Sequence, residues 1–175
     1  MKKEGRSLQQ MSNGNITLED LKKGPGYPSE ERFIKGFVPV IECVEEIPCD
    51  PCQTACNRDL IIVGKPITNL PRLIDPEGAC SGCAKCIVIC PGLAVFVVDK
   101  TFSENEASVA MPYELLPLPE EGDKIQGVDR AGNVVCDGYV QRIMSSKNLD
   151  HTNVVTIVIP KEFADEVRHF KRRVK

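Results

Sequence analysis

Two groups of four cysteines constrain this chain more than any other feature of its sequence. The second group has the spacing C-x2-C-x2-C-x3-C-P and consists of Cys80, Cys83, Cys86 and Cys90, followed by Pro91. Three cysteines two residues apart curl the backbone so that three sulfur atoms reach three irons of one cubane. Gly82 lets the chain pass close, and the fourth cysteine, on a short helical turn, faces the opposite way. The spacing therefore predicts ligands for [4Fe–4S] clusters.

The first group has the spacing C-x5-C-x2-C-x3-C and consists of Cys43, Cys49, Cys52 and Cys56. It differs from the second group in two ways. Its first gap is five residues instead of two, and Asn57 stands where the second group has proline. The longer loop over residues 44–48 can still return a sulfur atom to the same cluster corner, so all eight cysteines are candidate ligands.

The second group resembles the ligand run of bacterial ferredoxins, in which the fourth cysteine ligates the other of two clusters. Carried over residue by residue, this resemblance implies two [4Fe–4S] clusters with crossed ligands. The first, here called cluster one, takes Cys43, Cys49, Cys52 and Cys90. The second, cluster two, takes Cys56, Cys80, Cys83 and Cys86.

Other uses of the cysteines stay open at this point. Disulfides would need an oxidising compartment. A zinc ribbon could use Cys49-x2-Cys52 with Cys80-x2-Cys83, although it would leave Cys86 and Cys90 without a role. The irregular first group also allows a single cluster with an empty second site. The ninth cysteine, Cys136, lies within an expected strand, and we interpret it as a buried structural thiol.

The hydrophobic pattern predicts an α+β chain in three parts. Residues 1–35 form an N-terminal extension with a short helix that Thr17 can cap. Residues 36–100 form a dicluster ferredoxin-like domain, in which strands over 37–41 and 93–98 bracket the cysteines and can pair antiparallel. Between the cysteine groups, residues 59–71 indicate a strand, a turn and a second short apolar piece.

The third part, residues 101–175, is expected to be a small antiparallel, barrel-like β domain with a C-terminal helix. Residues 100–107 are polar, and Pro112, Pro117 and Pro119 mark a linker or edge. Apolar runs over 124–128, 134–143 and 154–159 predict strands, with a turn at 129–133. Apolar residues at helical spacing then predict a helix over 161–172, namely Phe163, Val167 and Phe170.

Composition excludes several classes of function. The net charge of −3 argues against a dedicated nucleic-acid binder. The sequence contains no run of 18 apolar residues, as a membrane-spanning helix would need. The polar N-terminus lacks the features of a secretory signal, so we expect a cytoplasmic protein. No phosphate-binding glycine motif and no catalytic constellation is recognisable. Residues 36–160 hold nine Lys and Arg against seventeen Asp and Glu. This acidic excess would suit a cationic docking face on a partner, and it would equally suit a surface that only keeps the protein soluble.

Several stretches together resemble the ferredoxin-like iron–sulfur subunits of multi-subunit FAD-dependent dehydrogenases of amino or imino acids, such as proline, hydroxyproline or sarcosine-type substrates. They are residues 40–56, 80–94, 116–119, 130–136 and 160–167. The resemblance implies a non-catalytic subunit that takes electrons from a flavoprotein partner and passes them on, in an assembly with FAD subunits and a possible [2Fe–2S] subunit. A free ferredoxin shuttle and a zinc-binding interaction module are the alternatives.

Overall fold

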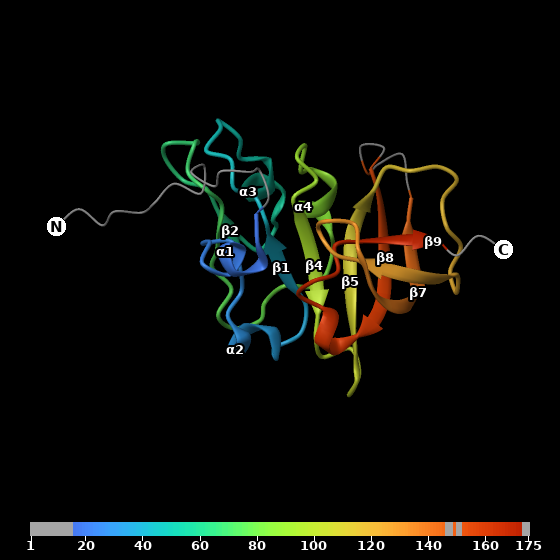
Figure 1. Ribbon diagram of the computed structural model, residues 1–175. Coiled ribbons are helices and arrows are strands. Elements are labelled where there is room, and N and C mark those ends of the chain that lie inside the picture. Colours follow the sequence, from blue (N-terminus) through green and yellow to red (C-terminus); the bar gives the residue numbers. More distant parts are fainter. Residues whose placement is uncertain (1–15, 146–148, 150–151, 173–175) are drawn as a thin grey trace.

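The computed structural model describes residues 16–145, 149 and 152–172, and these form a mostly antiparallel α+β fold (Figure 1). The general class expected from the sequence is therefore confirmed. The helices are short: α1 (Leu18–Lys22), α2 (Glu30–Phe33), α3 (Pro51–Ala55), α4 (Lys85–Val88) and the 3-10 helix η3 (Lys161–Phe163). The strands are β1 (Val38–Ile41), β2 (Ile61–Ile62), β3 (Arg72–Leu73), β4 (Val95–Asp99), β5 (Glu106–Tyr113), β6 (Lys124–Val128), β7 (Val134–Met144), β8 (Asn153–Pro160) and β9 (His169–Arg172).

A seven-stranded sheet with the order β1-β4-β5-β8-β7-β6-β9 organises the molecule. Its first pair joins the two strands that bracket the cysteines, with Val38 opposite Val98 and Ile41 opposite Val95. This antiparallel pairing confirms the sequence prediction. Strand β1 lies at the sheet edge, where Pro39 can stand without depriving a second neighbour of a hydrogen bond.

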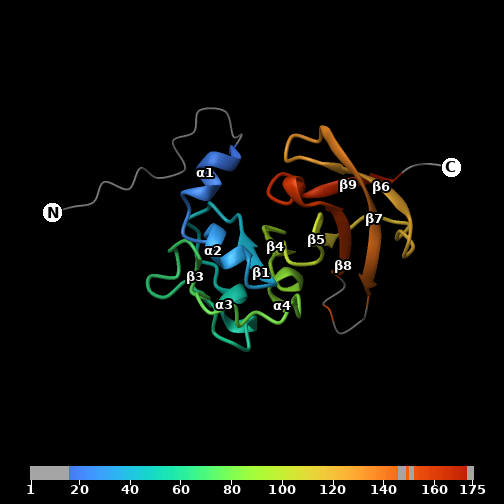
Figure 2. The same ribbon diagram turned by 90° about the horizontal axis from the view of Figure 1, so that it is seen from below.

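The sheet continues through residue 100, where the sequence suggested a boundary. Strands β4 and β5 are neighbours, and Asp99 lies opposite Ser108. Strand β5 was missed because its polar start and Pro112 are typical of a linker. Strand β5 pairs with β8 along its whole length, but its pairing with β4 ends at Ala110, opposite Val97. Pro112 is tolerated because it lies beyond this end, where β4 is no longer a neighbour. Figure 2 shows β1 and β3 with α1, α2 and α3 on one side, β6–β9 on the other, and β4 and β5 between them.

Beyond β5 the sheet curls back on itself. Strands β6, β7 and β8 match the three runs expected from the sequence. The Tyr113 ring of β5 stacks on Phe170 of β9, with centroids 5.2 Å apart. Within the described residues β9 pairs with β6 alone, so the sheet encloses a core without closing. The buried side chains between its walls include Val109, Ile125 and Ile157.

The predicted helix over residues 161–172 is wrong. A 3-10 helix covers Lys161–Phe163, and His169–Arg172 form strand β9 instead. The apolar spacing does bury Val167 and Phe170. However, the Arg168 N–H donates to the carbonyl of Val128, and the chain then joins the open edge of β6. Pairing of that edge outweighs local helix propensity.

The cysteine-bearing part has its own small core. Strands β2 and β3 pair antiparallel. The strand expected within residues 59–71 corresponds to β2, whereas β3 lies just beyond that stretch. Ile41, Ile61 and Ile87 are buried in one cluster with Cys52 and Cys86. Near the N-terminus, the Thr17 side chain accepts a hydrogen bond from the N–H of Asp20, so the expected cap of α1 is confirmed. The part of the predicted extension over residues 1–15 lies outside the described residues.

Candidate functional site

Two short helices set the direction of the cysteines. Helix α3 begins at Pro51, carries Cys52, and has Cys56 as its C-cap. Helix α4 follows Ala84, which has a φ of 61°, and carries Cys86. Because each helix is only about one turn long, the last cysteine of each group lies at the opposite end of the helix from the earlier cysteines of that group. The two helices contact each other, so each of these last cysteines lies beside the other group.

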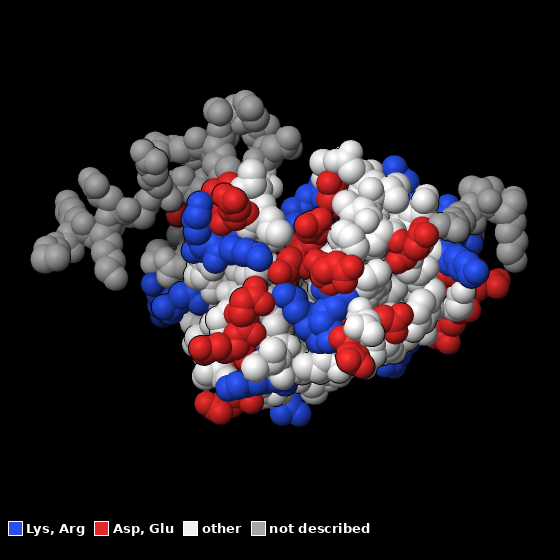
Figure 3. Space-filling model, turned by 60° about the horizontal axis from the view of Figure 1, so that its bottom comes forward, with Lys and Arg blue, Asp and Glu red and all other residues white. Residues whose placement is uncertain are grey.

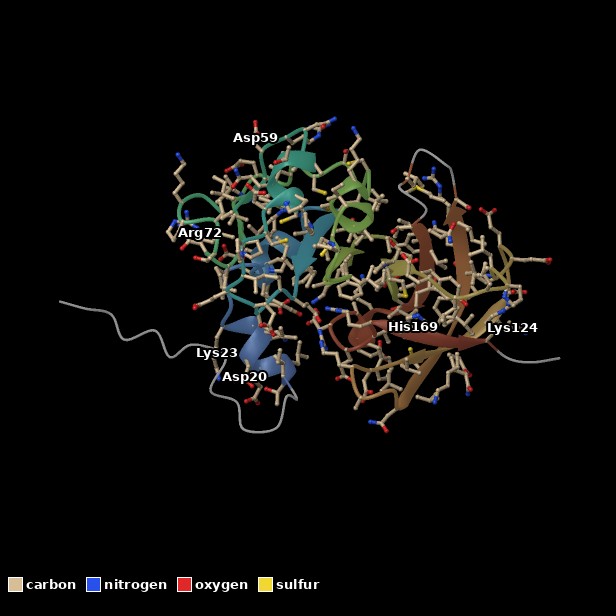
Figure 4. The ribbon with its side chains drawn as sticks, turned by 90° about the horizontal axis from the view of Figure 1, so that it is seen from above. Asp20, Lys23, Asp59, Arg72, Lys124 and His169 are labelled. Carbon is tan, nitrogen blue, oxygen red and sulfur yellow. The ribbon has the colours of Figure 1, made fainter. Side chains whose placement is uncertain are left out.

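The eight cysteines consequently line two separate cavities. A cavity of about 480 Å³ is lined by Cys56 from the first group together with three from the second: Cys80, Cys83 and Cys86. A much smaller one of about 30 Å³ has Cys90 from the second group together with three from the first: Cys43, Cys49 and Cys52. The structure thus brings together the same two crossed sets of four that the sequence predicted. In Figure 4 sulfur atoms are visible in the part of the molecule that lies beside Asp59.

Electrostatic influences divide the thiols in the same way. Burial and, to a smaller extent, the neighbouring thiols Cys80, Cys83 and Cys56 together raise the pKa of Cys86 to about 12. Burial, with smaller contributions from Cys90, Cys43 and Cys49, raises the pKa of Cys52 to about 11. Four neighbouring thiolates in such a site require a compensating positive charge, because burial and mutual repulsion favour the neutral thiols.

Backbone N–H groups point at the sulfur atoms. The N–H of Leu60 donates to Cys56 Sγ at 3.4 Å, and that of Ala94 donates to Cys90 Sγ at 3.4 Å. The N–H of Gly82 lies 3.5 Å from Cys80 Sγ. Gly82 has a φ of 68°, and a Cβ there would lie 2.9 Å from the Phe37 ring, so glycine is required both for the conformation and for the close approach.

The thiols surround space instead of converging on one point. Among the residues that the structure describes, no group of three or more His, Cys, Asp or Glu side chains could hold a metal ion. Cys83 is exposed, so the larger cavity reaches the surface. Beside the smaller cavity, Glu45, Glu46 and Ile47 in the loop between the first two cysteines are also exposed.

Cys136 lines neither cavity. It lies in β7 opposite Gly127 of β6 and packs against the core of the curled sheet. The thiol is only partly buried, so the prediction of a buried structural thiol is correct in its contacts and too strong in its burial. Burial, with a smaller contribution from the charge of Asp137, raises the pKa of Cys136 to about 11.

A buried ion-pair cluster joins the cysteine-bearing part to the curled sheet. Glu42, next to Cys43, accepts hydrogen bonds from Arg130 in the β6–β7 turn and from Arg168 before β9. Burial alone would raise the pKa of Glu42, but the hydrogen bonds and charges of the two arginines lower it below its usual value. On the face shown in Figure 3, acidic and basic side chains are intermixed.

A cavity of about 540 Å³ lies beside this cluster, lined by residues of α1, by Glu42 and by Asp129–Ala131. No cysteine is among the residues that line it. Sequence reasoning also missed Arg32 and Asp75, two buried charged residues beside the second cysteine group. The only signal for Asp75 is its place at the start of the turn-like Asp75-Pro76-Glu77-Gly78.

Comparison with protein-family models, with curated proteins and with solved structures found no match. Among the described residues, no helix combines the length and the apolar character needed to span a bilayer.

Proposed function

We propose that this chain is a dicluster ferredoxin-like electron-transfer subunit that carries two [4Fe–4S] clusters with crossed ligands. Cluster one is held by Cys43, Cys49, Cys52 and Cys90, and cluster two by Cys56, Cys80, Cys83 and Cys86. The observation that carries the proposal is the division of eight cysteines from two distant segments into two crossed sets of four. When bound, such clusters supply one-electron transfer.

The geometry favours a cluster over a zinc ion. Tetrahedral zinc with bonds of about 2.3 Å to sulfur would hold its sulfur atoms only about 3.8 Å apart. No group of side chains in the described residues is gathered to hold a single ion. Thiols spaced around a cavity of about 480 Å³ suit a polynuclear cluster, which has a width of its own.

The smaller cavity fits a cluster less readily. Its volume of about 30 Å³ leaves room for little more than water. A cluster there would require the loop over residues 44–48, which is exposed at residues 45–48, to shift outward. Because the two cavities differ so much in volume, a chain that carries cluster two alone is the specific alternative to this proposal.

The chain's own residues would tune and protect the clusters. The N–H groups of Leu60, Gly82 and Ala94 donate toward sulfur and would stabilise the more negative, reduced state. The apolar residues Ile41, Ile61 and Ile87 keep water from the inner sides of the sites.

The proposed donor is a flavoprotein amino or imino acid dehydrogenase subunit, and the acceptor is another flavin site or a downstream carrier. This part rests on the sequence resemblance. Size-exclusion of the native material tests it: co-elution with a flavin-containing chain supports the subunit, whereas a lone species of 19.3 kDa supports a free shuttle.

Serine variants test the crossed ligation. Cys56→Ser should remove the same electron paramagnetic resonance (EPR) signal as Cys83→Ser, since both would be ligands of cluster two. Cys90→Ser should remove the same signal as Cys49→Ser, since both would be ligands of cluster one. If Cys56→Ser instead removes the signal that Cys49→Ser removes, ligation follows the sequence groups and the crossing is wrong.

A further inference from the structure

A buried carboxylate holds the segment that carries Cys80. Asp75 Oδ1 accepts a hydrogen bond from the N–H of Ala79 at 2.6 Å, and its Oδ2 accepts one from the N–H of Cys80 at 3.2 Å. The Asp75 side chain is 1% exposed. A carboxylate that is removed from water and bonded to two successive amides fixes the direction in which the chain enters the cysteine group.

Arg32 of α2 neutralises this carboxylate from 43 residues away. Its Nε and Nη2 donate to Asp75 Oδ2 at 3.0 and 2.5 Å, and its side chain is 4% exposed. The remaining donors bond the carbonyls of Gly36 and Phe37, which lead into β1. The guanidinium thus ties α2, the start of β1 and the turn before Cys80 into one buried unit.

Two glycines bring the same two segments into backbone contact. Gly78 has a φ of 76°, and a Cβ there would lie 2.9 Å from both the Cβ and the carbonyl oxygen of Lys35. Lys35 Nζ also donates to the carbonyl of Pro76 at 2.7 Å. Four residues further on, Gly82 lies against the ring of Phe37. The loop over residues 75–82 therefore contacts residues 32–37 at several points between its first and its last residue.

We infer that Asp75 and Arg32 are positioning residues for cluster two that also set its reduction potential. The inference rests on the proposed function. A negative charge bonded to the N–H of a ligand cysteine disfavours the added electron, and the adjacent guanidinium cancels this effect. Removing either charge leaves the other uncompensated in a buried place beside the cluster.

The test is a redox titration of each cluster's EPR signal in the anaerobically purified holoprotein at pH 8. Asp75→Asn should raise the potential of cluster two, because the Arg32 charge is then uncompensated. Arg32→Gln should lower it, because the Asp75 charge is then uncompensated. Cluster one should keep its potential in both. Glu77→Gln is the matched control: it removes an exposed carboxylate from the same turn and should shift neither cluster, because solvent screens it.

Shifts of opposite sign confined to cluster two support the inference, because a general loss of packing would move both variants the same way. Shifts of equal sign, equal shifts in both clusters, or no shift overturn it. A wild-type protein without iron–sulfur clusters would instead overturn the proposed function itself.

A second pair of variants covers the case in which the charge variants fail to fold. The Gly78→Ala variant should lose cluster two and retain cluster one, because the added Cβ would displace the loop from Lys35. Gly122→Ala has a comparable φ of 89° with no atom within 4 Å of the new Cβ, and should retain both clusters. Retention of cluster two in Gly78→Ala would contradict the role of this contact.

Discussion

Replacing Glu42 by alanine should strongly destabilise the protein. Glu42 follows β1 and is the shared acceptor of Arg130 and Arg168, which belong to the far side of the curled sheet. The Glu42 side chain is 9% exposed and that of Arg168 is 5% exposed. Without the carboxylate, the buried Arg168 guanidinium would keep only the carbonyls of Ala164 and Val167 as hydrogen-bond acceptors among the residues that the structure describes.

The magnitude follows from this burial. Removing one partner of a buried ion pair costs about 3–5 kcal/mol, because the remaining charge loses its compensation. For a chain of this size, each kcal/mol shifts the midpoint of thermal unfolding by about 2–4 °C. We therefore expect the midpoint of Glu42→Ala to fall by about 6–20 °C.

The assay is thermal unfolding of the anaerobic holoprotein at one scan rate, followed by circular dichroism. Glu30→Ala is the matched control, because Glu30 also faces two cations, Lys22 and Lys100, but its side chain is 73% exposed. Solvent screening limits such a pair to about 1 kcal/mol or less. The double variant Glu42→Ala with Arg168→Met should recover part of the loss, since no buried charge then lacks its partner.

A midpoint for Glu42→Ala within about 3 °C of the wild type would refute the reasoning, because it would correspond to only about 1 kcal/mol. The reasoning would also be refuted if the double variant lost more stability than the two single variants lose in sum. Either result would mean that the guanidinium groups find solvent or other acceptors at little cost.

Three further predictions follow from the same structure. Cys136→Ser should leave the iron content unchanged, and a loss of about four irons per chain would make Cys136 a ligand. Gly82→Ala should weaken cluster two through its positive φ and its contact with Phe37, seen as faster loss of that EPR signal to an iron chelator; an unchanged rate would contradict this. Because the folded-state pKa of Glu42 is lowered, its stabilisation is present above its unfolded value near 4.5 and is lost as pH falls further. The difference in urea midpoint between wild type and Glu42→Gln should therefore stay constant from pH 7 to about 5 and shrink below that; growth of the difference in acid would show the opposite sign.

Local patterns predicted much of the framework. Alternating and continuous apolar runs located β1, β4, β6, β7 and β8, and the turn at 129–133 joins β6 and β7 as expected. The cysteine spacing identified the eight candidate ligands, and the resemblance to bacterial ferredoxins implied the two crossed sets of thiols that line the cavities.

The failures have a common cause in contacts between distant residues. Residues 169–172 form β9 instead of part of the predicted helix because they pair with the open edge of β6, a strand distant in the sequence. Strand β5 was hidden because Pro112 is typical of a linker, and the proline is tolerated only because the pairing with β4 has ended at Ala110. The bond between Arg32 and Asp75 joins residues that no local pattern connects. Such partners become visible only when the chain is folded.

The most direct test of the proposed function is the iron and acid-labile sulfide content of protein purified and kept without oxygen. The proposal predicts about eight iron and eight sulfide per chain, the content of two [4Fe–4S] clusters. About four of each would contradict a cluster in the smaller cavity, and a colourless protein with neither would contradict the proposed function as a whole.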